Sequence, residues 1–98
     1  MDASHKADLI RPWIDPDERV TVDFQNERGL NGEVIECDGQ TVTVLLETAF
    51  PHYRQHVTLP LSMISIGEDN GHYTRNPDKP LRYERLRLVV HEDRPQAV

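Results

Sequence analysis

The chain has 98 residues, of which 37% are hydrophobic and 29% charged, and its net charge is −6 at pH 7. This length suits one domain with a modest core, and no apolar run approaches the ~18 residues that cross a bilayer. The charged N-terminal segment lacks the apolar stretch of a secretory signal. A single cysteine, Cys37, excludes an internal disulfide and suits a reducing compartment. We therefore expect a cytoplasmic protein without a membrane span, in which Cys37 is a small buried side chain.

The negative charge is concentrated in the middle of the chain. Residues 20–66 carry six acidic and two basic side chains, whereas residues 67–98 carry six of each. An acidic protein repels nucleic acid and anionic lipid on average. Any contact with a polyanion is therefore expected only in the C-terminal third.

Residues 1–19 are expected to form an irregular N-terminal extension. The segment Ala7–Arg11 has the composition of one helical turn, which Pro12 would end because proline disfavours helix in the preceding residue. Trp13 and Ile14 are the large apolar pair of this segment. We expect them to pack as a lid over one end of a sheet.

Alternating apolar and polar residues predict three strands in the next part of the chain, at Val20–Phe24, Leu30–Cys37 and Thr41–Glu47. Leu45 lies on the face opposite the other apolar residues of its strand, so that face is also expected to be covered. Gly32 is predicted to form a bulge. Asp38-Gly39 has the sequence of a tight hairpin turn whose central residues have positive φ.

The remaining chain alternates between strand and turn patterns. We predict a loop at Thr48–His56, a fourth strand at Val57–Ile66 and a polar linker at Gly67–Pro80. Pro60 would put the fourth strand at an edge of the sheet. The last strand is predicted at Leu81–Val90.

These patterns predict an all-β fold. The expected domain is a small, strongly bent, five-stranded antiparallel barrel of the Sm-like or Src-homology-3-like type at residues 20–90. The N-terminal extension 1–19 is expected to be irregular and the tail 91–98 disordered.

The segment Gly32-Glu-Val34-Ile-Glu-Cys37-Asp38 resembles the first motif of the Sm and Hfq family of RNA-binding proteins. Val20–Asn26 resembles the first long strand of that family and its turn, and Ser62–Ile66 resembles the end of its second motif. The resemblance covers residues 20–66 and implies a small barrel that assembles as a ring. The family places a stacking side chain after the Asp turn, where this chain has Gln40-Thr41-Val42, so no RNA contact is carried over.

A second resemblance is to the YolD-like family of bacteria and phages. It depends on Val20–Val22, Gly32–Val34 and Leu59–Ile66. The resemblance implies a related small barrel and adds no functional residue.

No pattern in the sequence predicts catalysis, a metal or a cofactor. His52 and His56 are four residues apart, but on a strand this spacing separates them by ~13 Å, which is too far to share one ion. Cys37 has no third group positioned to activate it. Glu33 and Glu36 are expected on opposite faces of a strand, so they and Asp38 are interpreted as solvated acids. We expect a protein that is not an enzyme.

The C-terminal third carries the candidate nucleic-acid contacts. Basic side chains neutralise phosphates, and tyrosines can stack on unpaired bases. The alternative is that Arg85 and Arg87 form the polar face of the last strand and pair with acids of the domain itself. The candidates are Tyr73, Arg75, Lys79, Arg82, Tyr83, Arg85 and Arg87.

The loop at residues 48–56 carries the candidate protein contacts, because aromatic and arginine side chains are frequent in interface hot spots. These candidates are Phe50, His52, Tyr53 and Arg54. The functional hypothesis is a non-enzymatic binding or adaptor module that contacts another protein through a loop or a strand edge. The alternative is an Sm-like RNA-binding ring. The sequence leaves the oligomeric state and the partner open.

Overall fold

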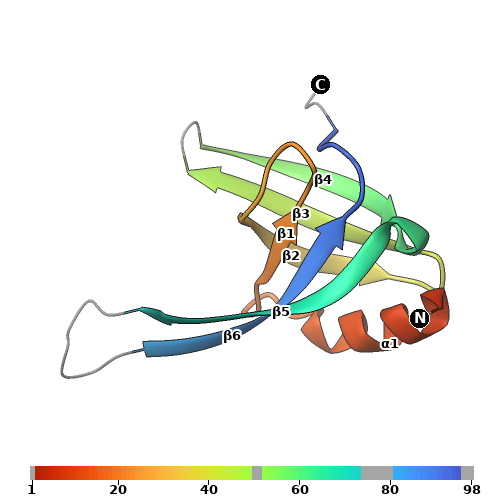
Figure 1. Cartoon of the computed structure of the whole chain (residues 1–98), viewed down its shortest axis with the longest axis horizontal. Helices are drawn as coiled ribbons and strands as arrows, with labels where there is room; N and C mark the ends of the chain where they lie inside the picture. The colour runs from red at the N-terminus through yellow and green to blue at the C-terminus, as the bar shows by residue number, and fades with distance from the viewer. Residues whose placement is uncertain (1, 50–51, 74–80, 96–98) are drawn as a thin grey trace.

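The computed structural model describes residues 2–49, 52–73 and 81–95. The chain begins with an α-helix and a short 3-10 helix, continues through four strands to a second 3-10 helix, and ends with two long strands (Figure 1). In chain order the elements are α1 (Ala3–Ile10), η1 (Arg11–Trp13), β1 (Val20–Asp23), β2 (Leu30–Cys37), β3 (Thr41–Ala49), β4 (His52–Pro60), η2 (Leu61–Met63), β5 (Ile64–Tyr73) and β6 (Leu81–Val90).

The strands form one six-stranded sheet in the order β4-β3-β2-β1-β6-β5. Neighbouring strands are antiparallel except for β1 and β6, which are parallel and align Thr21 with Arg87. The prediction of an all-β protein is therefore confirmed. The five-stranded antiparallel barrel differs from this sheet, which has six strands, mixed directions and two ends that are not joined. The sixth strand arises because the predicted fourth strand, Val57–Ile66, is divided by η2 into the end of β4 and the start of β5. β6 then lies parallel to β1.

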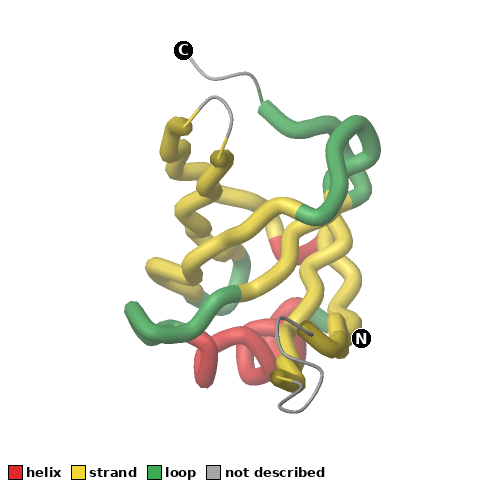
Figure 2. The backbone as a smooth tube through the Cα atoms, turned by 90° about the vertical axis from the view of Figure 1, so that its left-hand side faces the viewer, coloured by secondary structure: helices red, strands yellow, loops and turns green. Residues whose placement is uncertain are grey.

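The hydrophobic core lies on one face of the curved sheet and is closed at one end by α1 (Figure 2). Alternation places one apolar set of each strand on this face. The largest fully buried side chains are Phe24, Ile10, Leu46, Leu61, Ile64, Leu88, Val20, Val22, Val34, Val42, Val44 and Val90. Leu45, on the other face of β3, is also buried, as its apolar character predicted.

The N-terminal extension is helical where an irregular segment was expected. The carboxylate of Asp2 caps α1 by accepting a hydrogen bond from the N–H of His5 at 2.8 Å. Ala7 and Ile10 are fully buried in the core. An isolated helix of eight residues is marginal in water, so this burial is what holds α1 in place.

Pro12 and Trp13 belong to the 3-10 helix η1, which follows α1 directly. Pro12 lies inside η1, at a position where a missing N–H costs nothing. Trp13 is half-buried against the core, whereas Ile14 is 42% exposed. The predicted lid over the sheet therefore consists of α1 and Trp13 without Ile14.

Gly32 has a different role from the predicted bulge. A Cβ atom at this position would lie 2.8 Å from Cγ1 of Val44 and 3.0 Å from Cγ2 of Val22, so glycine lets β2 lie close to these core side chains. The register of β2 and β3 shifts between Val34 and Glu36, which leaves Ile35 as the extra residue, 41% exposed. The strand bends three residues later than expected.

The turn after β2 also differs from the prediction. Among the described residues only Gly29 has a positive φ, of 72°, so Asp38-Gly39 does not form the predicted turn. Instead the carboxylate of Asp38 accepts hydrogen bonds from the N–H groups of Gln40 and Thr41, both at 2.7 Å. These bonds hold the pKa of Asp38 below its usual value.

Two segments predicted as loop and linker are largely strand. β3 and β4 pair from Thr41–Pro60 to Ala49–His52, so the predicted loop at 48–56 is mostly ladder. β5 continues through Gly67 to Tyr73 and pairs with β6 along its whole length. The far halves of β5 and β6 form a two-stranded arm that projects from the body of the sheet (Figure 1). Pro60 ends β4, which is an edge strand as predicted.

Residues 91–95 contact the sheet, although the sequence predicted a disordered tail from residue 91. Arg94 is buried, with 8% of its surface exposed. Its backbone N–H donates to Asn26 at 2.6 Å, and its guanidinium donates to Gln55 and Glu27 at 3.1 and 2.8 Å. One side chain thus joins the loop after β1 to β4.

Candidate functional site

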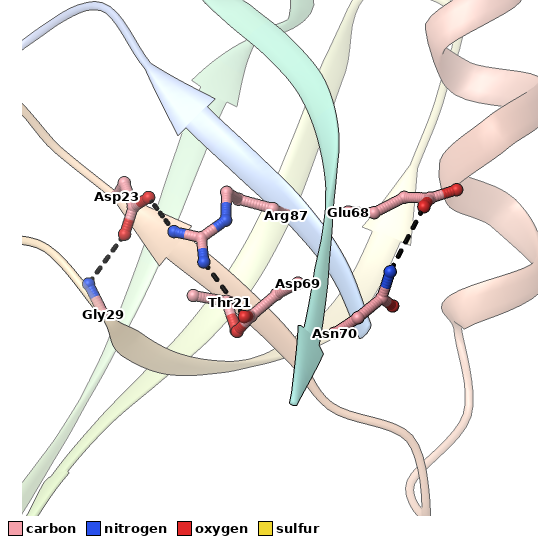
Figure 3. Close-up of polar contacts among 7 residues, drawn as sticks. All are labelled: Thr21, Asp23, Gly29, Glu68, Asp69, Asn70 and Arg87. Carbon is pink, nitrogen blue, oxygen red and sulfur yellow. Dashed lines mark hydrogen bonds and ion pairs between the residues drawn. The ribbon is translucent and has the colours of Figure 1, made fainter. Parts of the chain in front are cut away.

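A cluster of charged side chains lies on the sheet face opposite the core, where β5, β6 and β1 run side by side (Figure 3). The guanidinium of Arg87 lies between the carboxylates of Asp23 and Asp69, and it is 3.0 Å from Oδ1 of Asp69. The hydroxyl of Thr21 donates to Oδ2 of Asp69 at 2.6 Å. Thr21 and Asp23 are only 5% and 8% exposed. The cluster therefore joins three strands through a largely buried ion pair.

Asp23 is held in its ionised form by its neighbours. Burial alone would raise its pKa, but the N–H of Gly29, at 2.7 Å, and the guanidinium of Arg87 both favour the carboxylate. The net effect lowers the pKa of Asp23 below its usual value, and the carboxylate of Asp23 raises the pKa of Arg87. Both groups are charged at neutral pH and engaged with each other.

A second row of polar contacts crosses the same face from β6 to β4. Arg85 donates to the side-chain oxygen of Asn31 at 3.1 Å. The amide of Asn31 donates to Glu47 at 3.3 Å, and Glu47 pairs with Arg54 at 3.2 Å. This row links four side chains on four strands.

The two rows bear on the predicted nucleic-acid candidates. Arg87 pairs with the acids Asp23 and Asp69, as the alternative interpretation of the basic segment supposed. The contact described for Arg85 is instead with the side-chain oxygen of Asn31. Tyr73 ends β5, and Arg82 and Tyr83 lie on β6. Arg75 and Lys79 lie outside the described residues. Nucleic-acid binding by this set stays a prediction.

Three of the four predicted protein-contact residues lie on a strand rather than in a loop. His52, Tyr53 and Arg54 lie on β4, and Arg54 is 56% exposed while paired with Glu47. Phe50 lies outside the described residues. A role for this group in protein contact also stays a prediction.

An open pocket of about 300 Å³ lies on the core-side face of the β5–β6 arm, where the arm meets η1. Its lining combines one aromatic ring and one leucine with acidic, amide and basic residues. The lining residues are Trp13, Glu68, Asn70, Glu84, Arg85 and Leu86. Figure 3 shows Glu68 and Asn70 on the side of β5 away from Asp69, with the amide of Asn70 donating to Glu68 at 3.4 Å.

Sequence reasoning missed this pocket because its walls come from three separate segments. Glu68 and Asn70 fall in a stretch that composition predicts to be a linker. Trp13 is some 55 residues earlier in the chain. The available signal was the regular strand predicted at 81–90, because an antiparallel hairpin could pair it with the polar stretch that precedes it.

The described residues contain no group of three or more His, Cys, Asp or Glu side chains placed to hold a metal ion. Burial raises the pKa of the Cys37 thiol, which opposes formation of the reactive thiolate. In the part of the chain that the structure describes, no helix has the length and apolar character to cross a membrane.

Comparison of the chain with protein-family models, with curated proteins and with solved structures finds no match. The resemblances to the Sm and YolD-like families therefore stay predictions from the sequence.

Proposed function

We propose that this chain is a non-enzymatic binding module that takes an extended segment of a partner protein as an additional strand on β5. The supporting observation is the position of β5 at one end of the sheet, with β6 as its one neighbour among the described strands. An edge strand presents a row of backbone donors and acceptors that a second chain can pair with. β5 is ten residues long, and alternate residues direct their backbone groups away from β6.

The other edge of the sheet is less suited to this role. Pro60, the last residue of β4, has no N–H to donate. The C-terminal segment also reaches β4, where the amide of Gln55 donates to the carbonyl of Pro95 at 3.0 Å. β5 contains no proline.

The polar face of the arm favours a protein partner over a nucleic acid. Arg85 and Arg87 are bonded to Asn31, Asp23 and Asp69. A polyanion would have to displace these contacts and approach a chain with a net charge of −6. The Sm-like RNA-binding ring is therefore less well supported than the protein-binding module.

The test is selection of random octapeptides displayed on phage against the intact chain, followed by amide NMR of the chain with each selected peptide. We expect the largest shifts within Ile64–Tyr73, and new protection from solvent exchange at those amides of this strand that point away from β6. The amides of β3 serve as the internal control, because β3 already has a neighbour on each side. Shifts confined to β4 or to residues 91–95 would overturn the assignment to β5.

Light scattering with and without oligo-U RNA separates the alternative function. A five- to seven-subunit ring that changes mass with RNA would overturn the protein-binding proposal in favour of the Sm-like function. A monomer or dimer that is unaffected by RNA supports the proposal.

A further inference from the structure

We infer that the pocket beside β5 selects a positively charged side chain, with arginine preferred, so that the partner segment is a basic extended peptide. This inference rests on the proposed addition of a strand to β5. It names the class of peptide that the same edge would bind.

The register of the arm puts the pocket within reach of an added strand. Glu68 lies opposite Leu86, and Asn70 lies opposite Glu84, so these four side chains share one face of the arm. A residue paired directly opposite Glu68 or Asn70 on a new strand would have its Cβ within about 4.5–5.5 Å of theirs, on the same face. Its side chain would therefore enter the pocket that these residues line.

The charge of the pocket favours a cation. Glu68 and Glu84 are exposed carboxylates on neighbouring strands. Arg85 is also part of the lining, but its guanidinium donates to Asn31 on the opposite face of the sheet. The side chains that face the pocket are thus two acids, an amide, a leucine and a tryptophan.

Trp13 gives the pocket a preference among cations. It is half-buried against the core, which holds one wall of the pocket in place. A guanidinium stacks on an indole ring and also forms paired hydrogen bonds with carboxylates, whereas an ammonium does so less well. The aliphatic stem of the arginine would lie along Leu86.

Trp13 also provides the measurement, because it is the one tryptophan of the chain. A selected octapeptide is prepared in four forms that differ at the residue facing the pocket, which carries arginine, lysine, glutamine or glutamate. Tryptophan fluorescence is titrated with each form. We expect the affinity to fall in that order, by about tenfold from arginine to glutamine, and the arginine peptide to weaken as salt is added.

Substitutions in the chain identify the carboxylates. Glu68→Gln and Glu84→Gln are each expected to weaken the arginine peptide by about two- to fivefold, as exposed ion pairs do, and to leave the glutamine peptide unchanged. Glu36→Gln is the matched control, because Glu36 is an exposed acid of β2 outside the pocket. Equal losses of affinity for the arginine and glutamine peptides would mean that the carboxylates do not select the positive charge, and this would overturn the inference.

The two proposals fail differently. Peptides that protect the β5 amides without any preference for arginine would overturn the charge selection and leave the strand addition standing. Quenching of Trp13 by the arginine peptide without protection of β5 would overturn the strand addition. Absence of both signals would overturn both.

Discussion

The guanidinium of Arg87, on β6, donates to the carboxylate of Asp23, on the parallel neighbour β1. The side chain of Asp23 is 11% exposed and that of Arg87 is 32% exposed. β1 and β6 are the one parallel pair of the described sheet, whereas the predicted barrel was antiparallel throughout. The contact between Asp23 and Arg87 is therefore a direct link between the two halves of the sheet.

Replacing Asp23 tests how much this link stabilises the fold. We expect Asp23→Asn to lower the free energy of unfolding at pH 7 by about 1–3 kcal/mol, because a charged hydrogen bond is lost and Arg87 keeps its charge. Since the pKa of Asp23 is lowered in the folded state, its contribution is present above the usual value of 3.8 and is lost as the pH falls through the folded value.

Urea unfolding between pH 2 and pH 7 measures this contribution. The difference between the wild type and Asp23→Asn should be constant near neutrality and close below pH 3.8. Glu36→Gln, on the exposed face of β2, is the control for loss of one acid. A difference that does not change with pH would show that Asp23 acts by packing alone.

Glycine 32 allows a second test, of the close packing between β1, β2 and β3. A methyl group at this position meets Val44 and Val22 at 2.8 and 3.0 Å, so Gly32→Ala is expected to destabilise the domain by about 1–3 kcal/mol. At Gly39 nothing lies within 4 Å of an added Cβ. Gly39→Ala should therefore change the unfolding free energy by less than about 0.5 kcal/mol. Equal effects in thermal unfolding would contradict this account of Gly32.

The strands that sequence analysis predicted best are those with regular alternation. Leu81–Val90 was predicted with its observed bounds, and Leu86, Leu88 and Val90 are buried as the pattern required. The half of β5 beyond Ile66 was missed because glycine, aspartate and asparagine have low strand propensity. Pairing with β6 overrides that propensity, and this pairing is a tertiary effect that no local pattern encodes.

The candidate site was predictable only in part for the same reason. The pairing of Arg87 with acids of the domain was foreseen as an alternative, because this side chain lies between buried leucines in the alternating pattern. The pocket was not foreseen, since it requires Trp13 to meet a strand that the sequence does not predict. The sequence also predicted only one helical turn before Trp13, whereas α1 has eight residues. The burial of two of its side chains stabilises this helix, and this burial is a tertiary effect.

The dependence of α1 on the core gives a third prediction. Ile10 is fully buried, and Ile10→Ala should cost about 2–5 kcal/mol because it removes buried methylene groups and leaves a cavity. Leu9, one residue earlier, is 37% exposed, so Leu9→Ala should cost less than about 1 kcal/mol. Chemical denaturation followed by circular dichroism compares the two. A similar loss for both variants would mean that α1 does not dock through Ile10.

Arg94 gives the last prediction, because it holds residues 91–95 against the sheet. Its guanidinium bonds to Gln55 of β4 and to Glu27 in the loop after β1. We expect Arg94→Ala to reduce the unfolding free energy by about 1–3 kcal/mol, since the hydrogen bond to Gln55 and the charged hydrogen bond to Glu27 are lost. Hydrogen exchange should also become faster at the amide of Gln25, which donates to the carbonyl of Glu92 at 2.9 Å.

Arg19→Ala is the control, because Arg19 donates only to nearby carbonyls of its own loop in the described contacts. Unchanged exchange at Gln25 in Arg94→Ala would show that the C-terminal segment docks without this side chain.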